Sequence, residues 1–191
     1  MKKKIKKTSY NFSQIIENEK GWLFYDTNIK LWRRIHNLFL GKKILDVGCG
    51  SGISISISKV FDPDLNIEGF EEQENIRPIW EKRKIKVTTG KISKLPYKNS
   101  TFDTVYSSHV LEHLKNPVYA VSESIRVAKK RVIHVVPEGN VNSKNFGTPH
   151  LKIYNRINFL SLFSKFKLDI SLYESFQDTH MNSLIICLDK K

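Results

Sequence analysis

The sequence contains few cysteines and no long apolar run. Cys49 and Cys187 are the only cysteines among 191 residues, and their spacing matches neither a metal site nor a disulfide framework. We therefore predict no bound metal and two small, buried thiol side chains. No apolar run is long enough to cross a bilayer. The basic start MKKKIKK is followed by polar residues and not by the apolar core of a secretory signal, which predicts a cytoplasmic location.

Arginine is also scarce, although the formal net charge is +13. The positive charge comes mainly from lysine, which does not form the paired bonds to phosphate that arginine forms. The one dense lysine cluster lies at residues 2–7, close to a chain terminus. We therefore expect nonspecific attraction to anions. A nucleic-acid partner fits the charge but is not favoured.

Chain length and apolar patterning predict the architecture. A chain of 191 residues builds one substantial core, so we predict a single domain over residues 1–191, with an N-terminal helical extension over 1–40. Apolar runs predict seven strands, at residues 42–48, 66–72, 85–90, 102–110, 131–137, 168–176 and 182–189. Helical spacing predicts helices at residues 52–60, 74–84, 116–129 and 153–166. In the last of these helices, the spacing places Ile153, Ile157, Leu160 and Phe163 on one face.

The alternation of strands and helices predicts an α/β fold. We expect a doubly wound seven-stranded sheet, mostly parallel with one antiparallel edge strand, and helices on both faces. The last two strands are too close in sequence for a helix between them. They should therefore pair as an antiparallel hairpin at one edge of the sheet.

Three glycines follow the first predicted strand at alternate positions, in Asp46-x-Gly48-x-Gly50-x-Gly52. In an open parallel sheet, the turn after the first strand is a place where ligands bind. A triphosphate-binding loop requires a lysine after its last glycine, and a dinucleotide loop requires glycine at position 53, where this chain has isoleucine. Both of these ligand classes are therefore excluded.

This glycine motif resembles the first motif of the class I S-adenosylmethionine-dependent methyltransferases, in particular their small-molecule branch. The resemblance is clear over residues 40 to 138 and includes two later segments, GFEEQEN and TGKISKLPYKNSTFDTVYSSHVLEHLKNP. It implies a Rossmann-like methyltransferase domain of the EC 2.1.1 type with S-adenosyl-L-methionine as cofactor. The cofactor-binding residues that it implies are Asp46, Gly48, Cys49, Gly50, Gly52, Glu71, Ile92 and Ser108.

Two residues depart from the family pattern. Lys91 stands where the family usually has an aspartate for the adenine amino group, and a lysine ammonium cannot accept that hydrogen bond. Glu72 stands at a position that is usually apolar and stacked on the adenine. Either the backbone around Ile92 and Ser93 carries all of the adenine recognition, or the affinity for the cofactor is reduced.

The histidines are the candidates for removing a proton from the methyl acceptor. His109 ends the fourth predicted strand and should face the ligand crevice, and the imidazole pKa suits a general base near neutral pH. His150 follows a long loop in a region that lines the acceptor pocket in the similar family. We expect His113 to pack or to bond to backbone and His134 to lie in the core. His109 and His150 are thus the predicted catalytic residues.

Three functions remain open on these grounds. The favoured one is methyl transfer to an oxygen or nitrogen of a small polar metabolite or glycan precursor, with residues 141–152 as a candidate acceptor lid. The alternatives are an RNA methyltransferase and a catalytically inactive partner subunit of the same fold, the latter suggested by Lys91 and Glu72. The sequence lacks an Asn/Asp-Pro-Pro-Tyr/Phe motif and a Pro-Cys loop, which disfavours methylation of DNA-base amino groups and of cytosine C5. It leaves the oligomeric state open.

Overall fold

The computed structural model describes residues 25–139, 150–177 and 182–190. These residues form one seven-stranded sheet with the strand order β3-β2-β1-β4-β5-β7-β6. The strands are β1 (Lys43–Val47), β2 (Asn66–Glu71), β3 (Val87–Thr89), β4 (Phe102–Ser108), β5 (Ala128–Pro137), β6 (Asp169–Gln177) and β7 (Asn182–Asp189). The helices are α2 (Tyr25–Asn37), α3 (Ile53–Phe61), α4 (Arg77–Arg83), α5 (Pro117–Val127) and α6 (Arg156–Phe163), with short 3-10 turns η1 (Glu74–Ile76) and η2 (Leu111–His113).

The strand order reverses direction at β1. This strand pairs in parallel with β2 on one side and with β4 on the other, so the chain leaves β1 toward one edge and later returns to the opposite side. The connections after β1 and β4 therefore diverge and leave a crevice at the carboxyl ends of these strands, which is where ligands bind in open α/β sheets. The glycine motif lies at this point.

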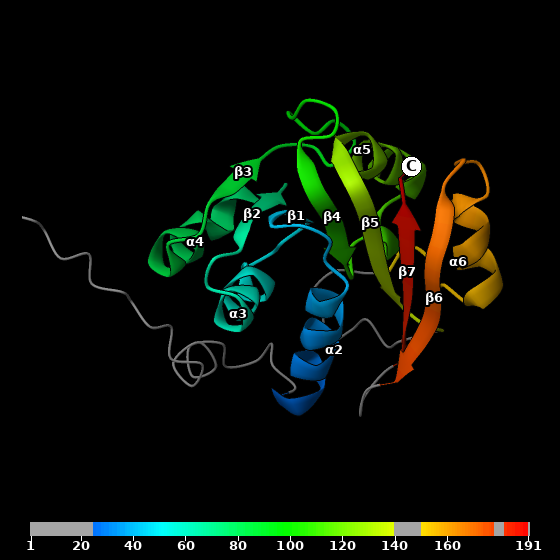
Figure 1. Cartoon of the computed structure of the whole chain (residues 1–191), viewed down its shortest axis with the longest axis horizontal. Helices are drawn as coiled ribbons and strands as arrows, with labels where there is room; N and C mark the ends of the chain where they lie inside the picture. Colours follow the sequence, from blue (N-terminus) through cyan, green and yellow to red (C-terminus); the bar gives the residue numbers. More distant parts are fainter. Residues whose placement is uncertain (1–24, 140–149, 178–181, 191) are drawn as a thin grey trace, which may run out of the picture.

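Apolar residues cover both faces of the sheet because neighbouring positions of the buried parallel strands point to opposite sides. On one side, Ile44 packs in a cluster with α2, α3 and α4; on the other, Leu45 packs in a cluster with α5 and α6. Figure 1 shows α2, α3 and α4 together and α6 on the far side of the sheet. No helix in the described ranges is both long enough and apolar enough to span a membrane.

The predicted fold class is confirmed. Strands β6 and β7 form the expected antiparallel pair at one edge, and β7 also pairs antiparallel with β5. The strand that runs against the others is therefore β7, and β6 forms the edge itself. Helix α2 lies within the predicted N-terminal extension, whereas residues 1–24 of that extension and residues 140–149 of the candidate lid lie outside the described residues.

Helix α6 buries a different face from the one that the sequence spacing predicted. Phe159 and Phe163 are buried in the core, but Ile157 is 81% exposed and Ile153 is 54% exposed. Apolar side chains occur on several sides of this short helix, so their spacing does not select a single core-facing stripe. The two phenylalanines provide the larger apolar surface, and they pack against each other with ring centroids 5.2 Å apart.

Candidate functional site

The loop after β1 presents backbone atoms at the edge of the crevice. Gly48, Gly50 and Gly52 all have positive φ, at 77°, 50° and 75°. A Cβ on Gly48 would lie 2.5 Å from Cγ2 of Val110, so only glycine fits there. Apart from its two chain neighbours, none of the described residues has an atom within 4 Å of the position that a Cβ on Gly50 would take. The loop therefore offers open space beside its peptide groups to a ligand.

Glu71 ends β2 next to this loop, and its carboxylate is held by backbone donors. The N–H of Gly50 donates to Oε2 at 2.9 Å, and the N–H groups of Glu72 and Gln73 donate to Oε1 at 2.8 and 2.9 Å. These three bonds fix both oxygens at the entrance of the crevice. An ionised carboxylate has about four acceptor positions, so it can still accept hydrogen bonds from a ligand hydroxyl.

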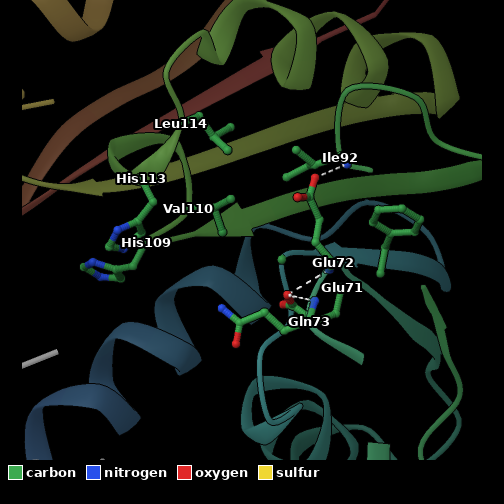
Figure 2. A pocket seen from close by; sticks show the side chains of 10 residues that line it. Glu71, Glu72, Gln73, Ile92, His109, Val110, His113 and Leu114 are labelled. Atoms are coloured by element: carbon green, nitrogen blue, oxygen red, sulfur yellow. Dashed lines mark hydrogen bonds between the residues drawn. The ribbon is translucent and has the colours of Figure 1, made fainter. Parts of the chain in front are cut away.

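A cavity of about 260 Å³ opens beside the loop and Glu71. Its lining consists of Gly48, Phe70, Glu71, Glu72, Gln73, Ile92, His109, Val110, His113 and Leu114. Figure 2 shows the acidic residues on one wall and His109 and His113 on another, with the apolar Val110 and Leu114 between them. The cavity thus joins a hydrogen-bond acceptor at one end to two imidazoles at the other.

The cavity residues fit the cofactor that the resemblance implies. Glu71 presents a carboxylate of the kind that accepts hydrogen bonds from ribose hydroxyls, and Ile92 and Val110 line the cavity with apolar surface. The side chain of Glu72 extends into the same space and accepts a hydrogen bond of 2.5 Å from the N–H of Ile92. This is the backbone region assigned to adenine recognition, so an adenine that binds there has to displace the Glu72 carboxylate.

Asp46 lies beneath the glycine loop and is buried. Its carboxylate accepts hydrogen bonds from Tyr106 Oη at 2.7 Å and from the Ser54 hydroxyl, which ties β1 to β4 and α3. Burial raises the pKa of Asp46 to about 7. Cys49 is buried as expected, and the Ser108 hydroxyl oxygen is buried with no hydrogen-bond partner within the described ranges. The cofactor contacts of these residues stay predictions.

His109 follows β4 in a left-handed backbone conformation with φ of 56°. Such a conformation is uncommon for a residue with a side chain and is found disproportionately at functional sites. The backbone N–H of His109 donates to the carbonyl oxygen of Val135 at 3.0 Å, which anchors the turn to β5. The imidazole lines the cavity, and its Nδ1 lies 3.5 Å from Oε1 of Glu112.

His150 lies near the same carboxylate although it is far away in sequence, with a ligand atom within 4.8 Å of one from Glu112. The N–H groups of Leu151 and Lys152 donate to the carbonyl oxygen of Glu112 at 2.8 and 3.0 Å. These bonds hold the segment that begins at His150 against turn η2. Burial is the main cause of a lowered pKa for the His150 imidazole, with the neighbouring His113 and His109 acting in the same direction and Glu112 opposing them.

The structure therefore groups Glu112 with His109, His113 and His150. His113, which we expected to pack or to bond to backbone, also lines the cavity and has its Nε2 3.9 Å from Glu112 Oε1. The sequence analysis did not select Glu112. The available signal was the spacing in His109-Val-Leu-Glu112-His113, which places one carboxylate within four residues of two imidazoles.

Comparison with known proteins places this site in a family. Residues 45–136 match the family described as a methyltransferase domain. This segment, just under half of the chain, belongs to the methyltransferase domain family, and solved S-adenosylmethionine-dependent methyltransferases share the fold of the chain. S-adenosylmethionine is accordingly the cofactor of this methyltransferase domain, and the matched segment runs from the glycine loop to the end of β5.

Individual relatives agree with the family assignment. The chain is 37% identical over 101 residues to an uncharacterized methyltransferase of Schizosaccharomyces pombe, covering 46% of this chain and 36% of that protein. It is 30% identical over 116 residues to the mitochondrial ubiquinone biosynthesis O-methyltransferase of the same organism, covering 54% and 41%. The alignments thus span about two fifths of these relatives. A solved S-adenosylmethionine-dependent methyltransferase from Aquifex aeolicus shares the fold with a TM-score of 0.71, at 17% identity over 94% of this chain and 98% of that one.

Proposed function

We propose that this methyltransferase domain moves the methyl group of S-adenosylmethionine to an oxygen or nitrogen of a small polar metabolite or glycan precursor. The main support for this proposal is that one cavity is lined by both Glu71 and His109. Glu71 lies where the ribose would be held, and His109 lies at the opposite wall, where an acceptor can enter.

The residues of the site suit the chemistry of methyl transfer. The cofactor supplies an activated methyl group on a positively charged sulfur, so alignment of the acceptor and removal of its proton are the main tasks left to the protein. His109 can accept that proton at Nε2, because its Nδ1 faces Glu112. The nearby carboxylate would stabilise the imidazolium ion that forms, and His150 provides a second imidazole beside it.

A catalytically inactive partner subunit is the second candidate. The hydrogen bond between Glu72 and the N–H of Ile92 favours it, because this bond engages a backbone donor that the adenine would need. If that bond were too strong to break, the fold would persist without binding the cofactor. Cofactor affinity therefore separates the two candidates.

Calorimetric titration with S-adenosylhomocysteine tests the proposal. We expect micromolar binding to the wild-type chain and at least tenfold weaker binding to Glu71→Gln, because a hydrogen bond to a charged group contributes about 1.5–3 kcal/mol. The matched control is Glu74→Gln, which changes a carboxylate that is 67% exposed and pairs with Arg77. Glu72→Ala should bind more tightly than the wild type, since the bond to Ile92 no longer has to be broken.

Methyl transfer is then measured as S-adenosylhomocysteine release with sugars and RNA as parallel acceptors. His109→Gln should lower kcat and change the affinity for S-adenosylhomocysteine by less than about twofold relative to the wild type. The reason is that His109 lies at the acceptor end of the cavity. Absence of binding to both the wild type and Glu72→Ala would contradict the proposal and support the inactive-subunit candidate.

A further inference from the structure

Glu112 is a buried carboxylate without ordinary hydrogen-bond partners. Its side chain is fully buried, and neither Oε1 nor Oε2 has a hydrogen bond within the part of the chain that the structure describes. Burying an ionised carboxylate costs several kcal/mol unless a cation or a set of donors compensates it. Glu71, by contrast, accepts three backbone hydrogen bonds. The surroundings of Glu112 therefore suggest that a positive charge belongs next to it.

The groups around Glu112 are imidazoles. One ligand atom each from Glu112, His113 and His150 lies within 4.8 Å of the other two, and the rings of His113 and His150 have centroids 4.9 Å apart. A zinc-type ion with ligands at about 2.1 Å needs its donor atoms roughly 3.4 Å apart. The separations of the three donor atoms therefore exceed that spacing by at most about 1.4 Å.

The backbone holds this cluster in place. The carbonyl oxygen of Glu112 accepts from the N–H groups of both Leu151 and Lys152, so the segment carrying His150 is fastened to the turn that carries Glu112 and His113. The buried Tyr154 hydroxyl also approaches the carbonyl oxygen of Leu111 at 3.5 Å. Ligands that are fixed by their supporting backbone lose little conformational entropy when an ion binds.

We propose that Glu112, His113 and His150 bind one divalent first-row transition-metal ion of the zinc type. The donor set consists of two imidazole nitrogens and a carboxylate, which suits zinc, iron or cobalt better than magnesium or calcium, since those two prefer oxygen ligands. Three protein ligands leave at least one coordination position for another molecule. The sequence analysis predicted no metal, because it considered cysteine spacing and did not bring these three residues together.

The position of this cluster adds to the proposed function, on which the next step rests. His113 and the neighbouring His109 line the cavity (Figure 2), so an ion held by His113 would lie next to its acceptor end. A bound ion would attract an oxygen of the acceptor and favour loss of its proton, whereas a protonated amine has no lone pair to offer. The methyl group would leave sulfur and bond to that oxygen, and the proton would pass to His109. The acceptor atom is thus an oxygen.

Cobalt provides a spectroscopic test that does not depend on activity. Titration of the metal-free 191-residue chain with Co²⁺, followed by visible absorption, measures binding, and mass spectrometry after Zn²⁺ loading and gel filtration measures the zinc content. We expect one ion per chain with micromolar or tighter affinity. His150→Ala and Glu112→Gln should each weaken Co²⁺ binding at least tenfold, since each removes a ligand.

The matched control is His36→Ala, because this partly buried histidine lies on α2, where its ring contacts Phe39 and the α3 residue Phe61 and not the cluster. The His150 side chain is only partly buried, so His150→Ala should keep the circular dichroism spectrum of the wild type. No bound ion, or equal affinities in His150→Ala and His36→Ala, would overturn the metal site. Metal binding without S-adenosylhomocysteine binding would uphold the site and overturn the proposed function.

Discussion

Two glutamates of the site show how strongly surroundings determine what a carboxylate can do. Glu71 is fastened by three backbone N–H groups at the end of β2. Glu112 is fully buried and faces imidazoles instead. The first arrangement suits a fixed acceptor for hydroxyl groups, whereas the second suits a partner for positive charge. The sequence analysis found Glu71 because the resemblance to the methyltransferase family implies it, whereas the spacing of Glu112 next to two histidines was the only local signal for Glu112.

His134 is a residue for which the sequence and the structure agree. It was expected in the core and is fully buried on β5, with Nδ1 2.7 Å from the Ser107 hydroxyl and the ring stacked on Phe163. Burial lowers its pKa to about 3. The unfolded chain, with an imidazole pKa near 6.5, takes up a proton that the folded chain excludes. The contribution of His134 to stability is thus present above pH 6.5 and decreases as the pH falls toward 3.

We predict that acidification from pH 7.5 to pH 5 destabilises the wild type more than His134→Gln. The wild type should lose about 2 kcal/mol more of its free energy of unfolding than the variant does. Each pH unit below 6.5 lowers the free energy of unfolding by up to about 1.4 kcal/mol through His134. Urea unfolding curves at both pH values, recorded for both proteins, measure it. Parallel losses in the two proteins would show that His134 is not the group responsible.

Helix α6 shows that the spacing of apolar residues in the sequence does not always predict which face of a helix is buried. The sequence placed Phe163 correctly but assigned Ile157 to the core face, whereas Phe159 occupies that place. The cap at Asn155 fixes where the helix begins, and its side chain accepts from the N–H groups of Ile157 and Asn158. In a helix of eight residues with apolar side chains on several sides, packing against the sheet decides which face is buried.

Truncation of two α6 residues should therefore have unequal effects. Phe159→Ala should lower the free energy of unfolding by about 3–5 kcal/mol, because it removes a fully buried ring that packs on Tyr154 and Phe163. Ile157→Ala should change it by less than about 0.5 kcal/mol, because this side chain is 81% exposed. Chemical denaturation of both variants measures the difference. Similar losses would mean that α6 packs through the face that the sequence spacing predicted.

At the scale of the whole molecule, the order of the strands assembles the site. β1, β2 and β4 are neighbours, so the glycine loop, Glu71 and His109 meet at one edge although they are far apart in sequence. The sequence predicted this meeting because parallel strands place their carboxyl ends together. The net charge of +13 is a second property of the whole chain, and it bears on the RNA alternative.

We expect the chain to bind unstructured RNA weakly and in a strongly salt-dependent way. Fluorescence anisotropy should show at least a tenfold loss of affinity between 50 and 200 mM salt, because contacts to phosphate release counterions. The affinity for S-adenosylhomocysteine should change by less than about twofold over the same range, since this ligand carries no net charge at neutral pH. Tight binding to one RNA sequence at 200 mM salt would instead favour an RNA methyltransferase.

The sequence alone determined where the strands and the glycine loop lie and which methyltransferase family the chain resembles. These features are local, since apolar alternation and glycine at positions of positive φ act within a few residues. Only the tertiary structure brought His150 to Glu112, because that contact depends on backbone bonds formed by Leu151 and Lys152 across a long separation in the chain. It also decided which face of α6 is buried and placed the Glu72 carboxylate on the N–H of Ile92. Such contacts depend on how several elements pack at once, and no short stretch of sequence encodes that packing.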